Sequence, residues 1–327
     1  MSVAPLLALT SADPWLAAPS RSHRDVPAVA GAALRWAQRN GLRDSQRFIE
    51  FASRAFPETR PDRVALFAEW LIWVFHFDDE LDEGALGRNP AEVARFCANL
   101  AESVRSPSEN PLQRAFAQLW NRTVPGMSEV WRQRFVDDFL RYVQAIEKEA
   151  ENRELKRVPD LAGYPDLRRC IAGPFMYDLM EPVIGVEVPP EIAETDVWWT
   201  LVNGAIDVIA WSNDIASREK ETAHGDVHNY VLVAAHHLGL DDAASCAWVV
   251  DRIQERLRDM HTAARQLPAL LRPLPHKQAR DTSKVACTLL GAPRGHLDWL
   301  CESPRYAADS PGFHQIGAML GGDEPAA

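Results

Sequence analysis

Two stretches of the chain carry oxygen-bearing side chains at helical spacing, and both could bind hard metal ions. In the first, an uncharged run over residues 70–77 ends in the acidic segment Asp78-Asp79-Glu80-Leu81-Asp82-Glu83. Asp78 lies seven residues after Leu71 and Asp82 four after Asp78, so both acids continue the inward-facing apolar stripe of one helix. Buried carboxylates repel each other unless a cation neutralises them, and such oxygen ligands suit Mg²⁺ or Mn²⁺ rather than zinc. The competing interpretation is a solvated acidic helix end.

The second stretch repeats this arrangement. Asn213, Ser217 and Glu221 are spaced four residues apart, so three oxygen-bearing side chains rise along one helix face. Ile206, seven residues before Asn213, belongs to the apolar stripe that this face extends. Taken alone, Asn213 and Ser217 could be a satisfied polar step in an ordinary helix. Two helices with the same arrangement favour a metal site.

The composition narrows the classes of function. The chain has 327 residues, of which 46% are hydrophobic and 25% charged, as in an ordinary globular protein. A formal charge of −11 excludes the basic stripe of a nucleic-acid surface, so an anionic ligand would need local cations. Five scattered cysteines fit a reducing compartment. The longest apolar run falls short of the about 20 residues that span a bilayer. We therefore predict a cytoplasmic protein without a membrane insertion.

The elements that position these residues are predicted to be helices throughout. Apolar periodicity, together with proline and glycine breaks, predicts a helix from about 26 that stops at Asn40-Gly41, then helices over 61–78, 91–106, 110–123, 128–150, 165–185, 192–221, 226–238, 241–266 and 277–291. Residues 151–163 are expected to be a charged linker. The fold class is all-α, with an irregular segment over 1–25, one helical domain over 26–310 and a tail over 311–327.

Two local features carry their own predictions. Gly173-Pro174 interrupts the helix over 165–185, and because proline has no N–H, we expect the Cys170 carbonyl to lose its helical hydrogen bond. Asp137-Asp138 is a second aspartate pair, but it lacks a third acid at the matching position. We therefore predict that this pair lies on the surface.

Several ordered landmarks resemble class I terpene synthases (terpene cyclases) of the bacterial type. Residues 78–83 fit the DDxxD motif of that family, and residues 213–221 fit its NDxxSxxxE motif. The run over 225–229, Gly-Asp-Val-His-Asn, is also similar to the family. Tyr164 and Arg168 resemble the segment with the arginine that senses diphosphate, and Trp299 followed by Arg305-Tyr306 resembles the C-terminal landmark. The resemblance extends from about Trp36 to Tyr306.

The resemblance implies an α-helical bundle around a deep apolar cavity, with three Mg²⁺ ions that Mn²⁺ could replace. Asp78, with Asp82, would hold two ions, and Asn213, Ser217 and Glu221 the third. Asp79, which we include among the metal-site residues, and Glu83 point off the main stripe and would support these ligands. Diphosphate oxygens would be bound by Arg168, Lys220, Arg305 and Tyr306. Arg169 is the alternative to Arg168 as the arginine that senses diphosphate.

The resemblance further implies ionisation of a linear isoprenyl diphosphate, followed by cyclisation of the carbocation. Phe75 and Trp299 are our candidates for the aromatic walls that would stabilise the cation. The expected substrate is farnesyl diphosphate, which gives a sesquiterpene. The alternatives are a diterpene synthase using geranylgeranyl diphosphate, a monoterpene synthase, a chain-elongating prenyltransferase and a non-catalytic helical scaffold. The prenyltransferase is disfavoured because Asn213 and Ser217 replace aspartates. The sequence does not decide the oligomeric state, and a homodimer is one possibility.

Overall fold

The computed structural model describes residues 4–42, 46–82, 86 and 89–302, and within these ranges every regular element is a helix. The elements are α1 (Ala4–Ala12), α2 (Val26–Arg39), α3 (Gln46–Ala55), α4 (Pro61–Asp82), α5 (Pro90–Ser103), α6 (Pro111–Thr123), α7 (Glu129–Leu155), α8 (Tyr164–Ile171), α9 (Phe175–Asp178), α10 (Met180–Ile184), α11 (Pro190–Ala193), α12 (Asp196–His224), α13 (Tyr230–Leu238), α14 (Asp242–Leu271) and α15 (His276–Glu302). The predicted all-α class is confirmed. No helix in the described ranges is both long and apolar enough to cross a membrane.

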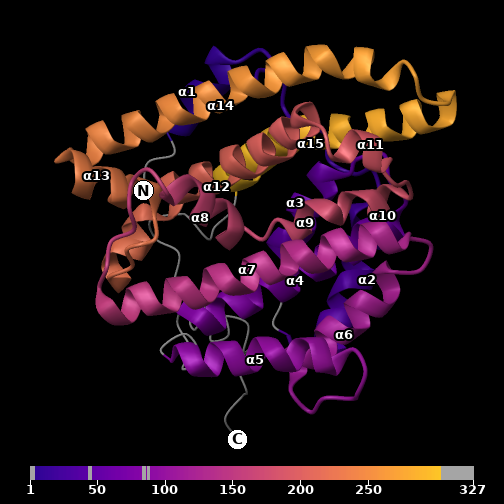
Figure 1. The fold of residues 1–327 in the computed structure, drawn as a ribbon, viewed down its shortest axis with the longest axis horizontal. Helices are drawn as coiled ribbons and strands as arrows, with labels where there is room; N and C mark the ends of the chain where they lie inside the picture. The colour runs from indigo at the N-terminus through magenta and orange to yellow at the C-terminus, as the bar shows by residue number, and fades with distance from the viewer. Residues whose placement is uncertain (1–3, 43–45, 83–85, 87–88, 303–327) are drawn as a thin grey trace, which may run out of the picture.

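The two helices that carry the metal-site motifs belong to different sides of the bundle. α4 packs against α2, α3, α6 and α10, whereas α12 packs against α8, α13, α14 and α15. Figure 1 shows α14 along the top of the view and α5 along the bottom, with α12, α7 and α4 between them. The space between α4 and α12 is therefore bounded by other helices of the bundle.

Aromatic packing fixes the rotation of α4 about its axis. Trp70 and Trp73 are fully buried, and the Trp70 ring meets Phe116 of α6 edge to face at 5.7 Å. The Trp73 indole N–H donates to the Leu112 carbonyl oxygen at 2.8 Å. With these two rings held toward α6, the face of α4 that includes Leu71 and Asp78 points in another direction, into the interior of the bundle.

α12 and α14 approach closely at a glycine. A Cβ atom added to Gly204 would lie 2.3 Å from Cγ of Met260 on α14, so a larger side chain there would force Met260 aside. Next to this contact, the buried carboxylate of Asp207 on α12 forms an ion pair with Arg256 of α14, with Nε 2.9 Å from Oδ2. The tight contact and the ion pair hold α12 against its neighbour.

Several predicted helix boundaries were wrong. The last helix, predicted over 277–291, continues to Glu302 as α15, and α14 ends at Leu271 rather than 266. α7 continues to Leu155 and is followed by Lys156 in the left-handed conformation with φ 50°, so the linker begins five residues later than 151. Glu151, Arg153 and Glu154 are good helix formers, and their charge was mistaken for a sign of a linker. α4 likewise extends beyond 78 to Asp82.

The N-terminal segment was predicted to be irregular, and this was wrong for residues 4–12. Ala4–Ala12 forms helix α1, which packs against α14 and α15. Leu6 and Leu9 have no exposed surface, and Pro5 stands in the first turn, where its missing N–H costs no helical hydrogen bond. Tertiary burial of two leucines stabilises a short helix whose sequence alone gave a weak signal.

Asp138 does not lie on the surface as predicted. Its residue is 6% exposed, its carboxylate receives Arg141 at 3.0 Å, and its pKa is raised by burial. Nearby, Arg134 of α7 donates to Asp178 at 2.7 Å and also contacts Glu181. Asp138 is therefore part of the charged cluster that joins α7 to α9 and α10, and only Asp137 faces solvent.

The helix is interrupted between α8 and α9, as the Gly173-Pro174 pair predicts. The carbonyl oxygens left without a backbone donor, however, are not the one that was expected. Gly173 has a φ of +73°, and its N–H donates to the Cys170 carbonyl oxygen at 3.1 Å. The Cys170 carbonyl therefore lacks the helical bond to residue 174, as expected, but it is not left free, because Gly173 supplies the donor instead. Among the described residues, no backbone N–H is bonded to the carbonyl oxygens of Ile171 and Ala172, which follow it.

Candidate active site

A cavity of about 160 Å³ lies between α3, α4, α8, α12 and α15, and it brings the two motif helices together. Polar side chains reach it from different helices, among them Asp78 from α4, Arg168 from α8 and Asn213 from α12, and Tyr177 and His296 also line it. The rest of its lining is largely apolar and includes Leu71 and Ile209. We call this space the chamber. A carboxylate, a guanidinium and an amide at one apolar chamber could bind an anion together with its metal ions.

The chamber wall is aromatic where Phe75 and Trp299 were predicted to contribute. Both residues line it. Phe75 stacks on Phe48 with ring centroids 4.1 Å apart, and Trp299 lies 6.3 Å from Phe75. The Trp299 indole N–H donates to the Arg47 carbonyl oxygen at 2.7 Å, which holds the indole in place. The wall thus presents ring faces whose positions are fixed by packing and by a hydrogen bond.

The predicted ligands of α12 follow one another along its length. Asn213 lines the chamber, and the buried Ser217 donates its hydroxyl hydrogen to the Asn213 carbonyl oxygen at 2.8 Å. Glu221 accepts a hydrogen bond from the Asn229 amide at 2.7 Å. Burial, reinforced by the negative charge of Asp214, raises the pKa of Glu221 to about 7. A carboxylate whose surroundings are this negatively charged and this shielded from solvent suits a metal cation. Asn213, Ser217 and Glu221 also offer only oxygen ligands, which hard cations prefer.

The acidic end of α4 is described in part. Asp78 lines the chamber, whereas Asp79 is half-buried and does not line it. Asp82 ends the helix, but its side chain lies outside the described residues, as do Glu83, Arg305 and Tyr306. Lys220 is half-buried on α12 beside Glu221 and does not line the chamber.

Adjacent arginines on α8 point in different directions. Arg168 lines the chamber, and its Nε donates to the Asp214 carboxylate at 2.8 Å. Arg169 pairs instead with Asp207 through two contacts of 2.9 Å, on the side that faces α14. Asp214 and Asp207 are both buried, so each guanidinium neutralises an acid that would otherwise be costly. Of the two arginines, only Arg168 lies where a chamber ligand could reach it.

Comparison with known proteins identifies the family. Residues 69–259 match the family described as terpene synthase family 2, C-terminal metal binding. The chain is 31% identical over 268 residues to (-)-delta-cadinene synthase of Streptomyces clavuligerus, covering 80% of this chain and 81% of that protein. It is 29% identical over 302 residues to (-)-beta-caryophyllene synthase ((2E,6E)-farnesyl diphosphate cyclizing) of Saccharothrix espanaensis, covering 87% and 86%. The chain belongs to the terpene synthase family.

The solved structures agree with this assignment. Germacradien-4-ol synthase from Streptomyces citricolor superposes with a TM-score of 0.78 and 27% identity, over 88% of this chain and 97% of that one. The predicted resemblance to class I terpene synthases is therefore confirmed, and the all-α architecture is that of this family. The family description also establishes that a terpene synthase of this kind has a metal-binding region.

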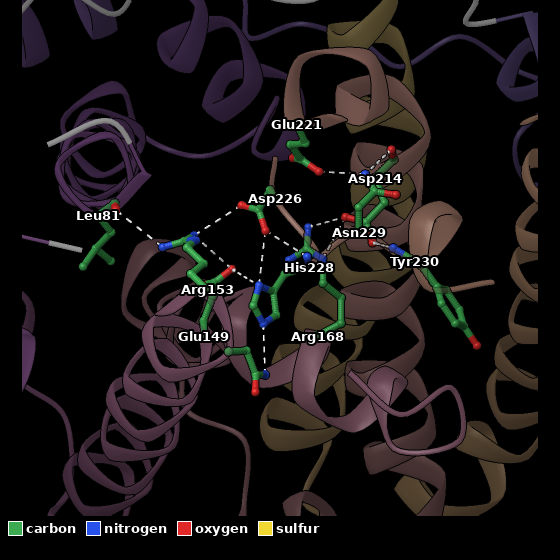
Figure 2. A network of polar contacts seen from close by, with 11 residues as sticks. Leu81, Glu149, Arg153, Arg168, Asp214, Glu221, Asp226, His228, Asn229 and Tyr230 are labelled. Atoms are coloured by element: carbon green, nitrogen blue, oxygen red, sulfur yellow. Dashed lines mark hydrogen bonds and ion pairs between the residues drawn. The ribbon is translucent and has the colours of Figure 1, made fainter. Parts of the chain in front are cut away.

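Asn229 is a site residue of this terpene synthase that the sequence motifs did not single out. Its side-chain amide donates to both the Asp214 carbonyl oxygen and the Glu221 carboxylate, each at 2.7 Å. Its side-chain oxygen accepts from the Val231 N–H at 2.9 Å and caps α13. Figure 2 shows Asn229 beside Asp214 and Glu221. The signal was present in the run over 225–229, to which no role was assigned.

Arg153 forms a second group that the motifs did not predict (Figure 2). It contacts Glu149 at 3.2 Å, Asp226 at 3.4 Å and the Leu81 carbonyl oxygen at 3.4 Å, so it joins α7 to the end of α4 and to the loop before α13. His228 lies within the same group, and its Nε2 contacts the Asn152 amide at 3.1 Å. Glu149, Asp226 and His228 offer ligand atoms within 4.8 Å of one another, but Arg153 already supplies a positive charge there. This terpene synthase thus connects both motif regions through one arginine.

Proposed function

We propose that this terpene synthase ionises farnesyl diphosphate and cyclises the resulting cation to a sesquiterpene hydrocarbon or alcohol, with release of diphosphate. The observation that carries the proposal is the chamber, where Asp78, Arg168 and Asn213 meet an aromatic and otherwise largely apolar wall. Such a site suits a substrate with an anionic head and a hydrocarbon tail. The relative from Saccharothrix espanaensis, described as farnesyl diphosphate cyclizing, supports the choice of substrate length.

The residues proposed to bind metal are those expected from the motifs. Asp78 and Asp82, supported by Asp79, would hold two Mg²⁺ ions, and the third would lie on Asn213, Ser217 and Glu221. When bound, these ions act as Lewis acids that draw negative charge onto the leaving diphosphate. Asn229 holds the Glu221 carboxylate in place for this purpose. Mn²⁺ could replace Mg²⁺ because both accept oxygen ligands.

The cationic side chains act on the leaving group. Arg168 is held by Asp214, which fixes its guanidinium at the chamber and leaves further N–H groups for diphosphate oxygens. We assign the same role to Lys220, Arg305 and Tyr306. Once the diphosphate has left, any water in the chamber would quench the carbocation before it cyclises. The packed wall that includes Phe75 and Trp299 keeps water out and offers ring faces to positive charge.

The proposal is tested by incubating the purified protein with the C10, C15 and C20 isoprenyl diphosphates and Mg²⁺. Diphosphate release is measured in parallel with gas chromatography of the hydrocarbon extract. We expect release and cyclic product with the C15 substrate, and neither when a chelator removes the metal. Cyclic product from C20 or C10 alone would replace the sesquiterpene by a diterpene or a monoterpene.

Two further outcomes would identify other functions. No diphosphate release from any substrate would favour a helical scaffold without catalysis. A longer isoprenyl diphosphate, formed only when isopentenyl diphosphate is added, would favour chain elongation. We place the enzyme in the cytoplasm, and sedimentation of the purified chain would decide whether it is a homodimer.

A further inference from the structure

His296 lies in the wall of the chamber. It comes from α15, is 4% exposed and faces the same cavity as Asp78 and Arg168. Its ring lies 5.5 Å from Phe51, edge to face, and 5.4 Å from Trp299. The family motifs did not point to His296, and the proposed function gives it no role. A basic side chain in an aromatic wall is chemically unlike its neighbours.

His296 also differs from the other buried histidines in the described part of the chain. The ring of His23 contacts the Thr59 carbonyl oxygen at 2.8 Å, and the ring of His228 contacts Asn152 at 3.1 Å. By contrast, Nδ1 of His296 is buried and has no hydrogen-bond partner. Buried polar atoms are normally paired, because leaving one unpaired costs stability. An unpaired ring nitrogen that persists in a substrate chamber indicates a role toward the substrate.

The ring of His296 is uncharged in the folded protein. Burial, together with the positive charge of Arg168, lowers its pKa from 6.5 to about 3. A neutral imidazole carries a hydrogen on one ring nitrogen and a lone pair on the other. The chamber therefore contains a weakly basic lone pair, placed among aromatic rings and close to the arginine proposed to bind the diphosphate.

We propose that His296 is the catalytic base that ends the reaction by taking a proton from the final carbocation. This inference rests on the proposed function, because the cation forms only after diphosphate leaves. A C–H bond next to the cationic carbon breaks, its electron pair forms the new C=C bond, and the proton bonds to the ring nitrogen lone pair. The hydrocarbon becomes neutral, and the ring becomes an imidazolium.

The weak basicity of the buried ring suits this step. A proton next to a carbocation centre is a far stronger acid than an imidazolium, so a ring that stays neutral at ordinary pH can still accept it. The imidazolium would then lose the proton readily, since burial and Arg168 both oppose its charge. The diphosphate released in the same turnover is the acceptor, which restores the neutral ring.

The test compares two variants of the chamber wall. His296→Phe keeps an aromatic ring of similar size but removes the lone pair, whereas Phe51→Leu changes the shape of the wall and leaves His296 in place. Each purified variant is checked by melting temperature and then incubated with the substrate that the wild type uses. Diphosphate release is measured beside the product distribution, which is separated by carbon skeleton and by the position of the double bond or hydroxyl group.

For His296→Phe we expect diphosphate release within about threefold of the wild type, because ionisation precedes the proton transfer. The share of the wild-type end product should fall by about tenfold or more, since one positioned base contributes at least that much. It should be replaced by double-bond isomers or alcohols of the same final skeleton. Phe51→Leu should instead yield other ring skeletons, because the shape of the wall guides the folding of the chain.

An unchanged product distribution in folded His296→Phe would overturn the assignment. So would a shift confined to other ring skeletons, which would make His296 an ordinary part of the wall. Failure of the wild type to release diphosphate would instead contradict the proposed function itself. If His296→Phe does not fold, His296→Gln is measured in its place, because it keeps a polar side chain without a basic ring, and the same product shift is expected.

Discussion

Exchanging each of the neighbouring arginines of α8 for lysine separates their roles. Arg168→Lys and Arg169→Lys both keep the positive charge that neutralises a buried aspartate, so both variants should fold. Alanine at 168 would leave Asp214 buried without its arginine, which costs about 3–5 kcal/mol and would confuse activity with stability, whereas Asp207 would keep Arg256. Lysine removes only the forked geometry and the additional N–H donors of the guanidinium.

The expected effects follow from where the two side chains lie. Arg168 uses Nε and Nη2 for Asp214 and lines the chamber, so a lysine held by Asp214 would keep fewer N–H donors, and no fork, for the diphosphate. Losing one hydrogen bond to a charged group in the transition state costs about 1.5–3 kcal/mol, or about 10- to 100-fold in rate. Arg169 contacts Asp207, which also receives Arg256 at 2.9 Å, so its exchange should change the rate by less than about threefold.

The assay is steady-state release of diphosphate at saturating metal, at a temperature well below both melting temperatures. Product distribution is recorded for each variant, so that early loss of the cation is also detected. A larger loss of rate for Arg169→Lys than for Arg168→Lys, with both variants folded, would refute the assignment and give the diphosphate role to Arg169. Equal losses would show that the effect is not specific to the chamber.

Three other changes test separate parts of the site. Asp78→Asn and Glu221→Gln should each slow diphosphate release by more than about tenfold, or about 1.4 kcal/mol at the transition state, and a folded Asp78→Asn enzyme with wild-type turnover would remove that residue from the metal site. Pro174→Ala should raise acyclic or early-quenched products if the carbonyls before the break steady the cation, whereas a change in melting temperature alone would mean that the break serves packing. His296 has a folded-state pKa of about 3 against 6.5, so the unfolded chain binds the extra proton and the free energy of unfolding falls as the pH drops below 6.5. By about pH 4.5 this amounts to about 2–3 kcal/mol. In urea titrations at about pH 7 and about pH 4.5, His296→Phe should therefore lose less stability than the wild type, and an equal loss would contradict a neutral buried ring.

The sequence predicted the parts of the site that depend on helical periodicity. Asp78 and Asn213 each extend an apolar stripe, and a stripe that faces the core must carry its polar end to the same interior, where the two side chains line one chamber. Phe75 and Trp299 line the chamber, and their role as walls for the cation stays a prediction. Arg168 lines the chamber and Arg169 pairs with Asp207 outside it, while the choice of Arg168 as the diphosphate-binding arginine stays a prediction.

What escaped the sequence depends on contacts between distant segments. The role of Asn229 arises because the loop after α12 folds back against that helix, so its amide reaches Glu221 and the Asp214 carbonyl oxygen. Asp138 looked like a surface acid because nothing local shows that α9 and α10 cover it. His296 gave no motif, and its significance appears only when the chamber closes around an unpaired nitrogen.

The contacts of Arg153 have a consequence for how the end of α4, α7 and the loop over 225–229 open. The arginine is bonded at once to the last turn of α4, to α7 and to the loop that precedes α13, so none of these segments can separate without breaking a contact to the same guanidinium. Segments joined in this way open together as one cooperative unit rather than by independent fraying. In amide hydrogen exchange, the end of α4 and the loop over 225–229 should therefore share one opening free energy, and Arg153→Ala should separate it into two.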